Sequence, residues 1–179
     1  MFTVRITKRE CKDKVKIERF LEEAQVGYLG MSAGGVPYVV PMNYAWLNGA
    51  VYIHGAEEGK RAHYLKENDQ VCFAIGEHYG TMTSPVPAHT DTAYMSVVMN
   101  GTASFLTDWD EATEAMQCML NKYVPGFYDQ PLARSHVEKY RSSLGARTAI
   151  IKIVPSEITA KENAPVEDQL FRPGAKLRE

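Results

Sequence analysis

The residues best placed to bind an anion follow a short apolar run and begin a segment with helical spacing. They are Gly59, Lys60 and Arg61. A glycine lets the backbone approach a ligand closely, two cations attract negative charge, and a helix start offers free N–H groups. This combination suits a monophosphate. It also suits a solvated helix start in which Glu57 and Glu58 complement the helix end, so the local pattern leaves both interpretations open.

His54 ends the apolar run that precedes this segment, directly before a glycine. Its ordinary pKa of about 6.5 would let it donate a proton near neutral pH. It could therefore contact a ligand ring or protonate a small acceptor, or it could simply cap a sheet. The alternation along the run predicts that Val51 and Ile53 face one side of a strand, with Tyr52 and His54 on the other.

A third pattern lies in the run VPMNYAW, residues 40–46. Pro41 cannot donate to a sheet ladder, so it predicts an edge strand or a bulge. Either would leave backbone groups of Met42, Asn43 and Tyr44 free to meet a polar planar ring. An edge strand that only discourages aggregation is the alternative.

The sequence lacks the motifs of other common enzyme classes. It contains no G-x-S-x-G, H-E-x-x-H, G-x-G-x-x-G or P-loop pattern, and its three cysteines lie far apart with no histidine at zinc-ligand spacing, so no metal site is expected. A net charge of -2 favours neither nucleic acid nor an anionic membrane surface, and no apolar run predicts a signal peptide or a membrane span. We expect a cytoplasmic protein and, if it is an enzyme, one in which a cofactor carries the difficult chemistry.

Local patterns predict the elements that position these residues. Thr7 and Glu10 form a capping box, Asp108 and Glu111 repeat it, and Asn48-Gly49 between two β-rich runs predicts a hairpin. Helices are predicted over residues 8–24, 60–67, 109–122 and 132–144, the last one ended by Gly145. Residues 77–92 are predicted to form a long loop suited to a lid.

Strands joined by tight turns predict a mainly β chain, an antiparallel barrel of about six strands, closed or partly closed, with flanking helices. One domain is expected over residues 1–161. The charged, proline-containing tail over residues 162–179 is expected to be loosely ordered.

The runs VPMNYAW, NGAVYIHGAEEGKRAHYLKENDQVCFAI and YMSVVMNGTASFL together resemble the pyridoxamine 5′-phosphate oxidase-like flavoproteins, which have the FMN-binding split barrel fold. The similarity covers about residues 5–160 and is strongest to the subgroup related to 5-nitroimidazole reductases. It implies FMN as the cofactor and a homodimer with FMN at the subunit interface. The tail sequence FRPGAKLRE lacks the R-L-x-P segment of true pyridoxamine phosphate oxidases, so oxidation of vitamin B6 is not expected.

The resemblance also implies roles for individual residues. Lys60 and Arg61 would hold the FMN phosphate with Gly59 giving room, and Ser96 would make a polar contact to the cofactor. His54 would be the catalytic side chain that meets the acceptor. The full set of implied cofactor contacts is Pro41, Met42, Asn43, Tyr44, Ile53, His54, Gly55, Gly59, Lys60, Arg61 and Ser96.

The function implied is that of an FMN-dependent oxidoreductase that takes electrons from a small donor and reduces a small acceptor, such as a nitroaromatic or nitroimidazole. Two alternatives stay open. One is a flavin-binding or redox-sensing protein without turnover, and the other is a split barrel that binds haem or a deazaflavin instead.

Overall fold

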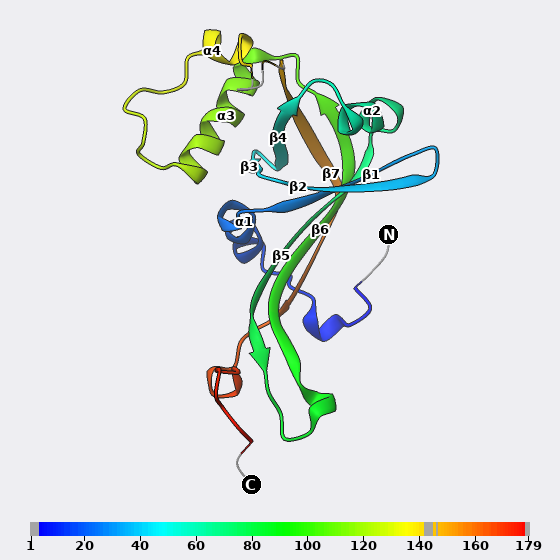
Figure 1. Cartoon of the computed structure of the whole chain (residues 1–179), viewed down its shortest axis with the longest axis vertical. Coiled ribbons are helices and arrows are strands. Elements are labelled where there is room, and N and C mark those ends of the chain that lie inside the picture. The colour runs from blue at the N-terminus through cyan, green and yellow to red at the C-terminus, as the bar shows by residue number, and fades with distance from the viewer. Residues whose placement is uncertain (1–3, 142–144, 146, 178–179) are drawn as a thin grey trace.

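The computed structural model describes residues 4–141, 145 and 147–177. Their strands form one antiparallel sheet in the order β2-β1-β5-β6-β7-β4-β3 (Figure 1). The bounds are β1 Gly27–Ala33, β2 Val36–Met42, β3 Ala45–Leu47, β4 Ala50–Ala56, β5 Gln70–Met82, β6 Asp91–Phe105 and β7 Thr148–Asn163. The mainly β fold class with flanking helices is therefore confirmed.

The sheet has seven strands where the sequence predicted about six. The difference arises because the run predicted as one strand breaks at Asn43 and Tyr44. On one side of the break, β2 pairs with β1; on the other, β3 pairs with β4. Since β2 and β3 are the two edge strands of the sheet and only two residues join them, the edges must lie close together. The sheet thus curls into a partly closed barrel without a ladder between its edges.

The hairpin predicted at Asn48-Gly49 is confirmed. These residues connect β3 to β4 with φ angles of 51° and 74°, the left-handed backbone that a two-residue turn of this kind requires. Leu47 pairs with Ala50 across the turn. This turn sets the register of β4 and so fixes which of its side chains face each side.

The predicted loop over residues 77–92 is wrong for most of its length. β5 continues to Met82 and pairs with β6 from Asp91, so only residues 83–90 connect the two strands. The register shifts between His78 and Gly80, and Gly80 has a φ of 139°. This irregularity interrupts the alternation that would have revealed the strand. The segment forms a long arm that extends away from the barrel (Figure 1).

The first helix, α1, spans Lys14–Glu23 and starts six residues later than predicted. Asp13 caps it by accepting from the Lys16 N–H at 3.1 Å. The predicted capping box fails because the preceding segment is tied to the sheet: the Cys11 N–H donates to the Ala160 carbonyl at 3.0 Å. Thr7–Arg9 forms only a 3-10 turn.

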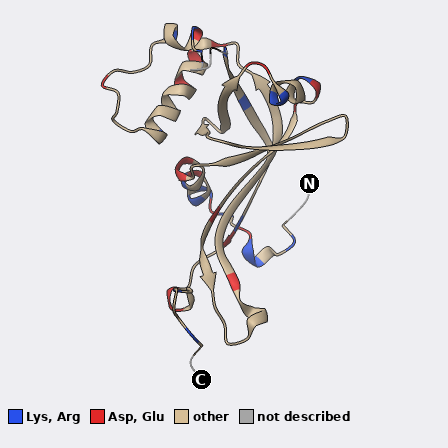
Figure 2. Ribbon diagram, in the orientation of Figure 1, with Lys and Arg blue, Asp and Glu red and all other residues tan. Residues whose placement is uncertain are grey.

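The other predicted helices are largely confirmed. They are α2 (Lys60–Glu67), α3 (Trp109–Tyr123) and α4 (Arg134–Glu138). Asp108 caps α3 by accepting from the Asp110 N–H at 2.8 Å. The helix predicted over 132–144 is shorter, and residues 142–144 of it lie outside the described part of the chain. Figure 2 shows that charged residues of both signs gather mainly on the helices and turns.

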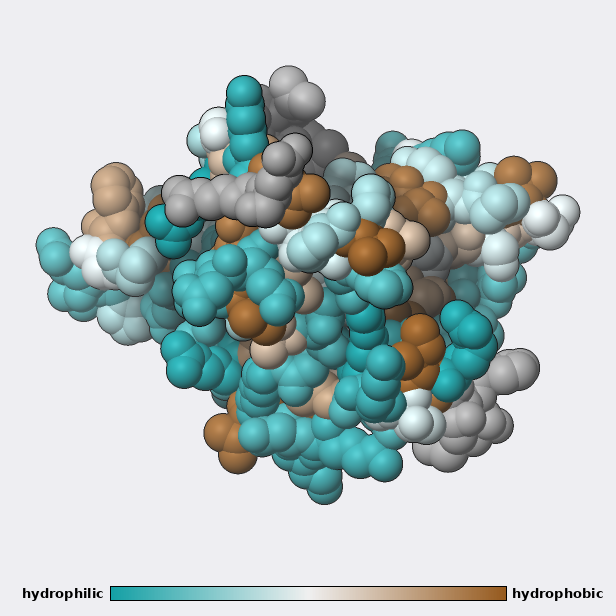
Figure 3. Space-filling model, turned by 90° about the horizontal axis from the view of Figure 1, so that it is seen from below, coloured by the Kyte–Doolittle hydropathy of each residue, from teal (hydrophilic) through white to brown (hydrophobic). Residues whose placement is uncertain are grey.

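Two buried clusters lie on opposite faces of the sheet around β4. Val51 and Ile53 belong to the main core inside the barrel. Tyr52 belongs to a second cluster, which α3 covers with Met116 and Met119. The predicted alternation along β4 is confirmed, and it directs His54 toward α3. Seen from below, the surface is mostly hydrophilic with apolar residues in scattered groups (Figure 3).

The tail is more ordered than the sequence suggested. β7 reaches Asn163, and the chain beyond it returns to the arm. There the Phe171 N–H donates to the Thr81 carbonyl and the Thr83 N–H to the Gln169 carbonyl, both at 2.8 Å. The domain boundary at residue 161 stays a prediction. No helix in the described ranges is both long and apolar enough to cross a membrane.

Candidate cofactor site

The guanidinium of Arg61 lies between the end of β4 and the edge strand β2. Its Nη2 donates to the Ala56 carbonyl at 3.1 Å, and its Nη1 lies 3.7 Å from the Met42 sulfur. Its Nε is buried and has no hydrogen-bond partner, and among the described residues no carboxylate forms an ion pair with this side chain. Burial lowers the pKa of Arg61, yet a guanidinium stays charged at neutral pH. A half-buried cation with an unpaired donor is suited to bind an anion.

Gly55 makes room for this guanidinium. A Cβ built on Gly55 would lie 2.2 Å from Nη2 of Arg61, far inside van der Waals contact. Any larger residue at this position would displace the end of the arginine side chain. Gly55 and Arg61, predicted to be neighbours in the site, are thus brought into direct contact.

The start of α2 adds further donors. Gly59 is its N-cap with a φ of 98°, and it supplies no side chain to satisfy the first N–H groups of the helix. The Lys60 ammonium lies 4.3 Å from the centroid of the Tyr38 ring. Glu57 points elsewhere: its carboxylate lies 3.6 Å from Nε of Arg147. Its place does not support the alternative in which this glutamate complements the helix end.

His54 is half-buried beside α3, with Nδ1 3.2 Å from the sulfur of Met119. Burial, with a further contribution from the positive charge of Arg61, lowers the pKa of His54. The imidazole is therefore neutral near pH 7, and the argument from its ordinary pKa does not apply in the folded protein. A neutral imidazole still offers one N–H donor and one acceptor nitrogen.

The edge-strand prediction for Pro41 is confirmed, because β2 pairs only with β1 and its register is regular. Met42 contacts Arg61, and Asn43 is exposed at the break between β2 and β3. The expectation of a free backbone is wrong for Tyr44. Its N–H donates to the Tyr123 hydroxyl at 2.9 Å, and its carbonyl lies 3.1 Å from the same hydroxyl.

Ile53 and Ser96 do not join the cluster around Arg61 through their side chains. Ile53 is fully buried in the main core, so only its backbone could meet a ligand. Ser96 lies in the middle of β6, opposite Gly76 and Lys161. Through β5 and β1, its neighbour Val97 is level with Met42, three strands away or roughly 15 Å at the usual strand spacing. Among the described residues, Ser96 makes no hydrogen bond to Arg61.

Two residues near the site were missed from the sequence. Tyr123 satisfies the backbone of Tyr44, and the ammonium of Lys122 lies 3.7 Å from the centroid of the Tyr44 ring. Burial lowers the pKa of Lys122 to about 8. Helical spacing could place both residues on α3, but no local signal could pair them with a strand 79 residues earlier.

The donors present fit one phosphate group. Arg61 offers a buried, unpaired Nε, α2 offers its first N–H groups, and Lys60 lies at the same helix start. The described part of the chain has no group of three potential metal ligands. The arrangement can bind a phosphate at the end of β4 and expose a planar ligand to His54 and the β2 edge.

A family model and several solved structures are similar to this chain. The family model for pyridoxamine 5′-phosphate oxidase matches residues 13–162. The flavocytochrome Anf3 of Azotobacter vinelandii has a TM-score of 0.75 at 18% identity over 99% of this chain and 86% of its own. The FAD and heme binding protein of Mycobacterium smegmatis has a TM-score of 0.70 at 13% identity over 89% and 76%.

A candidate 5-nitroimidazole antibiotic resistance protein of Bacteroides thetaiotaomicron has a TM-score of 0.65 at 23% identity, with 85% of each chain covered. A search of curated proteins gives no significant match. The structural similarities establish the split-barrel fold, and the family match spans most of the sequence, as the sequence resemblance predicted. The chain belongs to the pyridoxamine 5′-phosphate oxidase family.

Proposed function

We propose that this protein binds FMN and acts as an oxidoreductase that reduces a small acceptor, such as a nitroaromatic or nitroimidazole. The observation that carries the proposal is the half-buried guanidinium of Arg61, which packs against Gly55 with an unpaired Nε and no carboxylate partner among the described residues. An unpaired buried donor is costly, so a ligand oxygen is expected there. The names of the similar structures, which include FAD and heme binding proteins, support a flavin.

FMN fits the charge and chemistry of this place. A phosphate would accept hydrogen bonds from Nε of Arg61 and from the first N–H groups of α2, with the ammonium of Lys60 close by. When bound, the isoalloxazine ring would supply the electron transfer to the acceptor. Backbone groups of Met42 and Asn43 would orient the ring from the break between β2 and β3.

His54 would hold a proton on one ring nitrogen and present it as a hydrogen-bond donor. Because burial keeps the imidazole neutral near pH 7, His54 would orient an acceptor through this bond without adding a positive charge. Met119, whose sulfur lies 3.2 Å from Nδ1, limits the directions that the ring can take.

We further propose a homodimer with the cofactor at the subunit interface. Membership of the pyridoxamine 5′-phosphate oxidase family supports this arrangement, because the sequence resemblance to these flavoproteins implies FMN at the subunit interface. Sedimentation of the FMN-loaded protein tests the dimer, and a monomer that retains FMN would contradict it.

The proposed activity is tested by reducing the FMN-loaded protein without oxygen and then adding a nitroarene. Rapid reoxidation of the flavin, with loss of the nitro compound, is expected. Flavin that stays reduced after acceptors of different size are added would support the alternative of a binding or redox-sensing protein. A haem spectrum in the purified protein, in place of a flavin spectrum, would refute FMN as the cofactor.

A further inference from the structure

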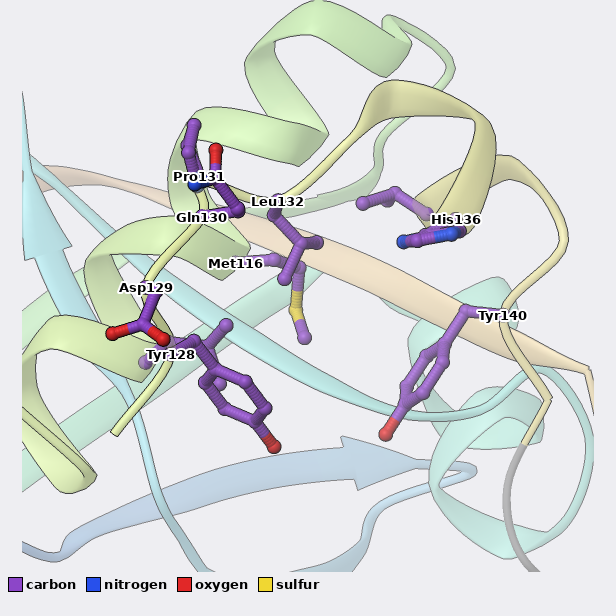
Figure 4. A pocket seen from close by; sticks show the side chains of 10 residues that line it. Met116, Tyr128, Asp129, Gln130, Pro131, Leu132, His136 and Tyr140 are labelled. Carbon is purple, nitrogen blue, oxygen red and sulfur yellow. The ribbon is translucent and has the colours of Figure 1, made fainter. Parts of the chain in front are cut away.

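A pocket of about 610 Å³ lies between α3, α4 and the segment over residues 128–132 (Figure 4). This volume is in the range that holds a small organic ligand. Its floor is apolar and includes Met116, Leu132 and Val137. Val137 is buried in the second cluster, so the floor rests on packed structure.

Aromatic side chains surround this floor. Tyr128 and Tyr140 lie on either side of the opening, the Met116 side chain points into the space between them, and His136 extends toward it from α4 (Figure 4). Two tyrosine rings and a methionine sulfur suit a flat aromatic ligand, which can stack on the rings and contact the sulfur.

The charge of the lining separates one class of aromatic ligand from another. Among the described residues that line the pocket, Asp129 is the only carboxylate, and none is a lysine or an arginine. A phosphate dianion would lose its water without gaining a counter-charge and would meet the Asp129 carboxylate. A neutral or cationic ring avoids both the uncompensated desolvation and the repulsion by Asp129.

Two chains of contacts connect this pocket to the candidate cofactor site. On one side, Met116 lies one helical turn from Met119, whose sulfur contacts His54. On the other side, the Tyr140 carbonyl accepts from the Thr148 N–H at 3.2 Å, and Thr148 pairs with Ala56.

The second chain of contacts leads directly to the candidate phosphate site, because the Ala56 carbonyl also accepts a hydrogen bond from Arg61. Neighbouring strands lie about 5 Å apart, so the backbone of Tyr140 is roughly 10 Å from that of Ala56. Packed residues thus connect the pocket to His54 and to the arginine that would hold the cofactor phosphate, although neither of these two lines it.

We propose that this pocket is a ligand site that selects flat aromatic molecules that are neutral or cationic, and discriminates against phosphorylated ones. This preference does not rest on the proposed function, in which the acceptor is reduced beside His54.

The test compares two ligands with the same ring, neutral 4-nitrobenzyl alcohol and dianionic 4-nitrophenyl phosphate. Their binding is measured by calorimetry on the FMN-loaded protein and on the flavin-free Arg61→Ala variant, because the flavin-free wild type would offer the phosphate ester the site at Arg61. The alcohol is expected to bind at least about tenfold more tightly, because the phosphate must be desolvated without a counter-charge. Equal affinities, or tighter binding of the phosphate ester, would overturn the proposal.

Variants test whether the pocket causes the preference for the alcohol over the phosphate ester. Asp129→Lys should reduce the ratio of the two affinities by roughly two- to fivefold, the size of one exposed charge interaction. Glu114→Lys makes the same charge change on an exposed position of α3 outside the pocket lining and should leave the ratio unchanged. Leu132→Trp should fill the pocket and abolish binding of the alcohol. Circular dichroism confirms that each variant is folded, and identical ratios in wild type and Asp129→Lys would refute the assignment.

FMN uptake by each variant, measured separately, distinguishes the two proposals. Protein that takes up FMN but shows no preference for the alcohol would refute only the ligand pocket. Protein that binds the alcohol in a manner sensitive to Leu132→Trp, but takes up no FMN, would refute only the proposed function.

Discussion

Replacing Arg61 with alanine is expected to weaken FMN binding strongly while the flavin-free protein keeps its stability. In the structure the guanidinium has one backbone bond, to Ala56, and a buried Nε without a partner. Charge-assisted hydrogen bonds contribute about 1.5–3 kcal/mol each, so loss of two bonds to a phosphate costs at least about 3 kcal/mol. This corresponds to a rise of roughly 150-fold or more in the dissociation constant for FMN.

Stability should respond differently. Loss of the bond to Ala56 costs on the order of 1 kcal/mol, and removal of a half-buried charge without a counter-charge offsets much of that cost. The free energy of unfolding of the flavin-free protein should therefore change by less than about 1 kcal/mol. Urea denaturation measures stability, and fluorescence quenching of FMN measures binding.

A matched control removes an arginine that has an exposed partner. Arg19→Ala takes away a cation on α1 that pairs with Glu23, at 2.7 Å, and should leave FMN affinity unchanged. An Arg61→Ala protein that binds FMN as tightly as wild type would refute the phosphate assignment. A variant whose free energy of unfolding falls by as much as its free energy of FMN binding would show that Arg61 has a structural role.

Three further perturbations follow from the same contacts. Gly55→Ala, whose Cβ would lie 2.2 Å from Nη2, should displace the Arg61 side chain and lower FMN affinity with the charge retained; unchanged affinity in titrations would contradict this packing. Because burial lowers the pKa of His54, the folded protein resists its protonation, so stability should fall as pH drops below about 6.5, and His54→Gln should flatten this dependence in calorimetric scans; parallel curves would refute it. Tyr123→Phe leaves the Tyr44 N–H unpaired and should cost about 1–3 kcal/mol in urea denaturation, whereas an unchanged midpoint would show that the bond contributes nothing.

Local patterns predicted the parts of the site that are local in sequence. Asn48-Gly49 specified the turn before β4, alternation along β4 placed His54 on the same face as Tyr52, and the glycine start of α2 was predicted at Gly59. Gly55 and Arg61 meet because only a short turn separates β4 from α2. These features depend on backbone conformations that a few residues determine.

Features that depend on distant partners could not be predicted. The arm was mistaken for a loop because the bulge at His78 and Gly80 breaks its alternation, and its pairing needs β6. Tyr44 was expected to have a free backbone because nothing near it in sequence reveals Tyr123. The lowered pKa of His54 likewise results from burial by α3, 65 residues away. The family resemblance, and not local chemistry, supplied the identity of the cofactor.

The identity of the bound cofactor tests the central claim most directly. The protein is purified without added flavin, its visible spectrum is recorded, and the small molecule released on denaturation is identified by mass; the same is done for Arg61→Ala. We expect a flavin spectrum and the mass of FMN from the wild type, with much less FMN from the variant. A haem or deazaflavin, or FMN retained equally by both proteins, would contradict the cofactor site assigned to Arg61.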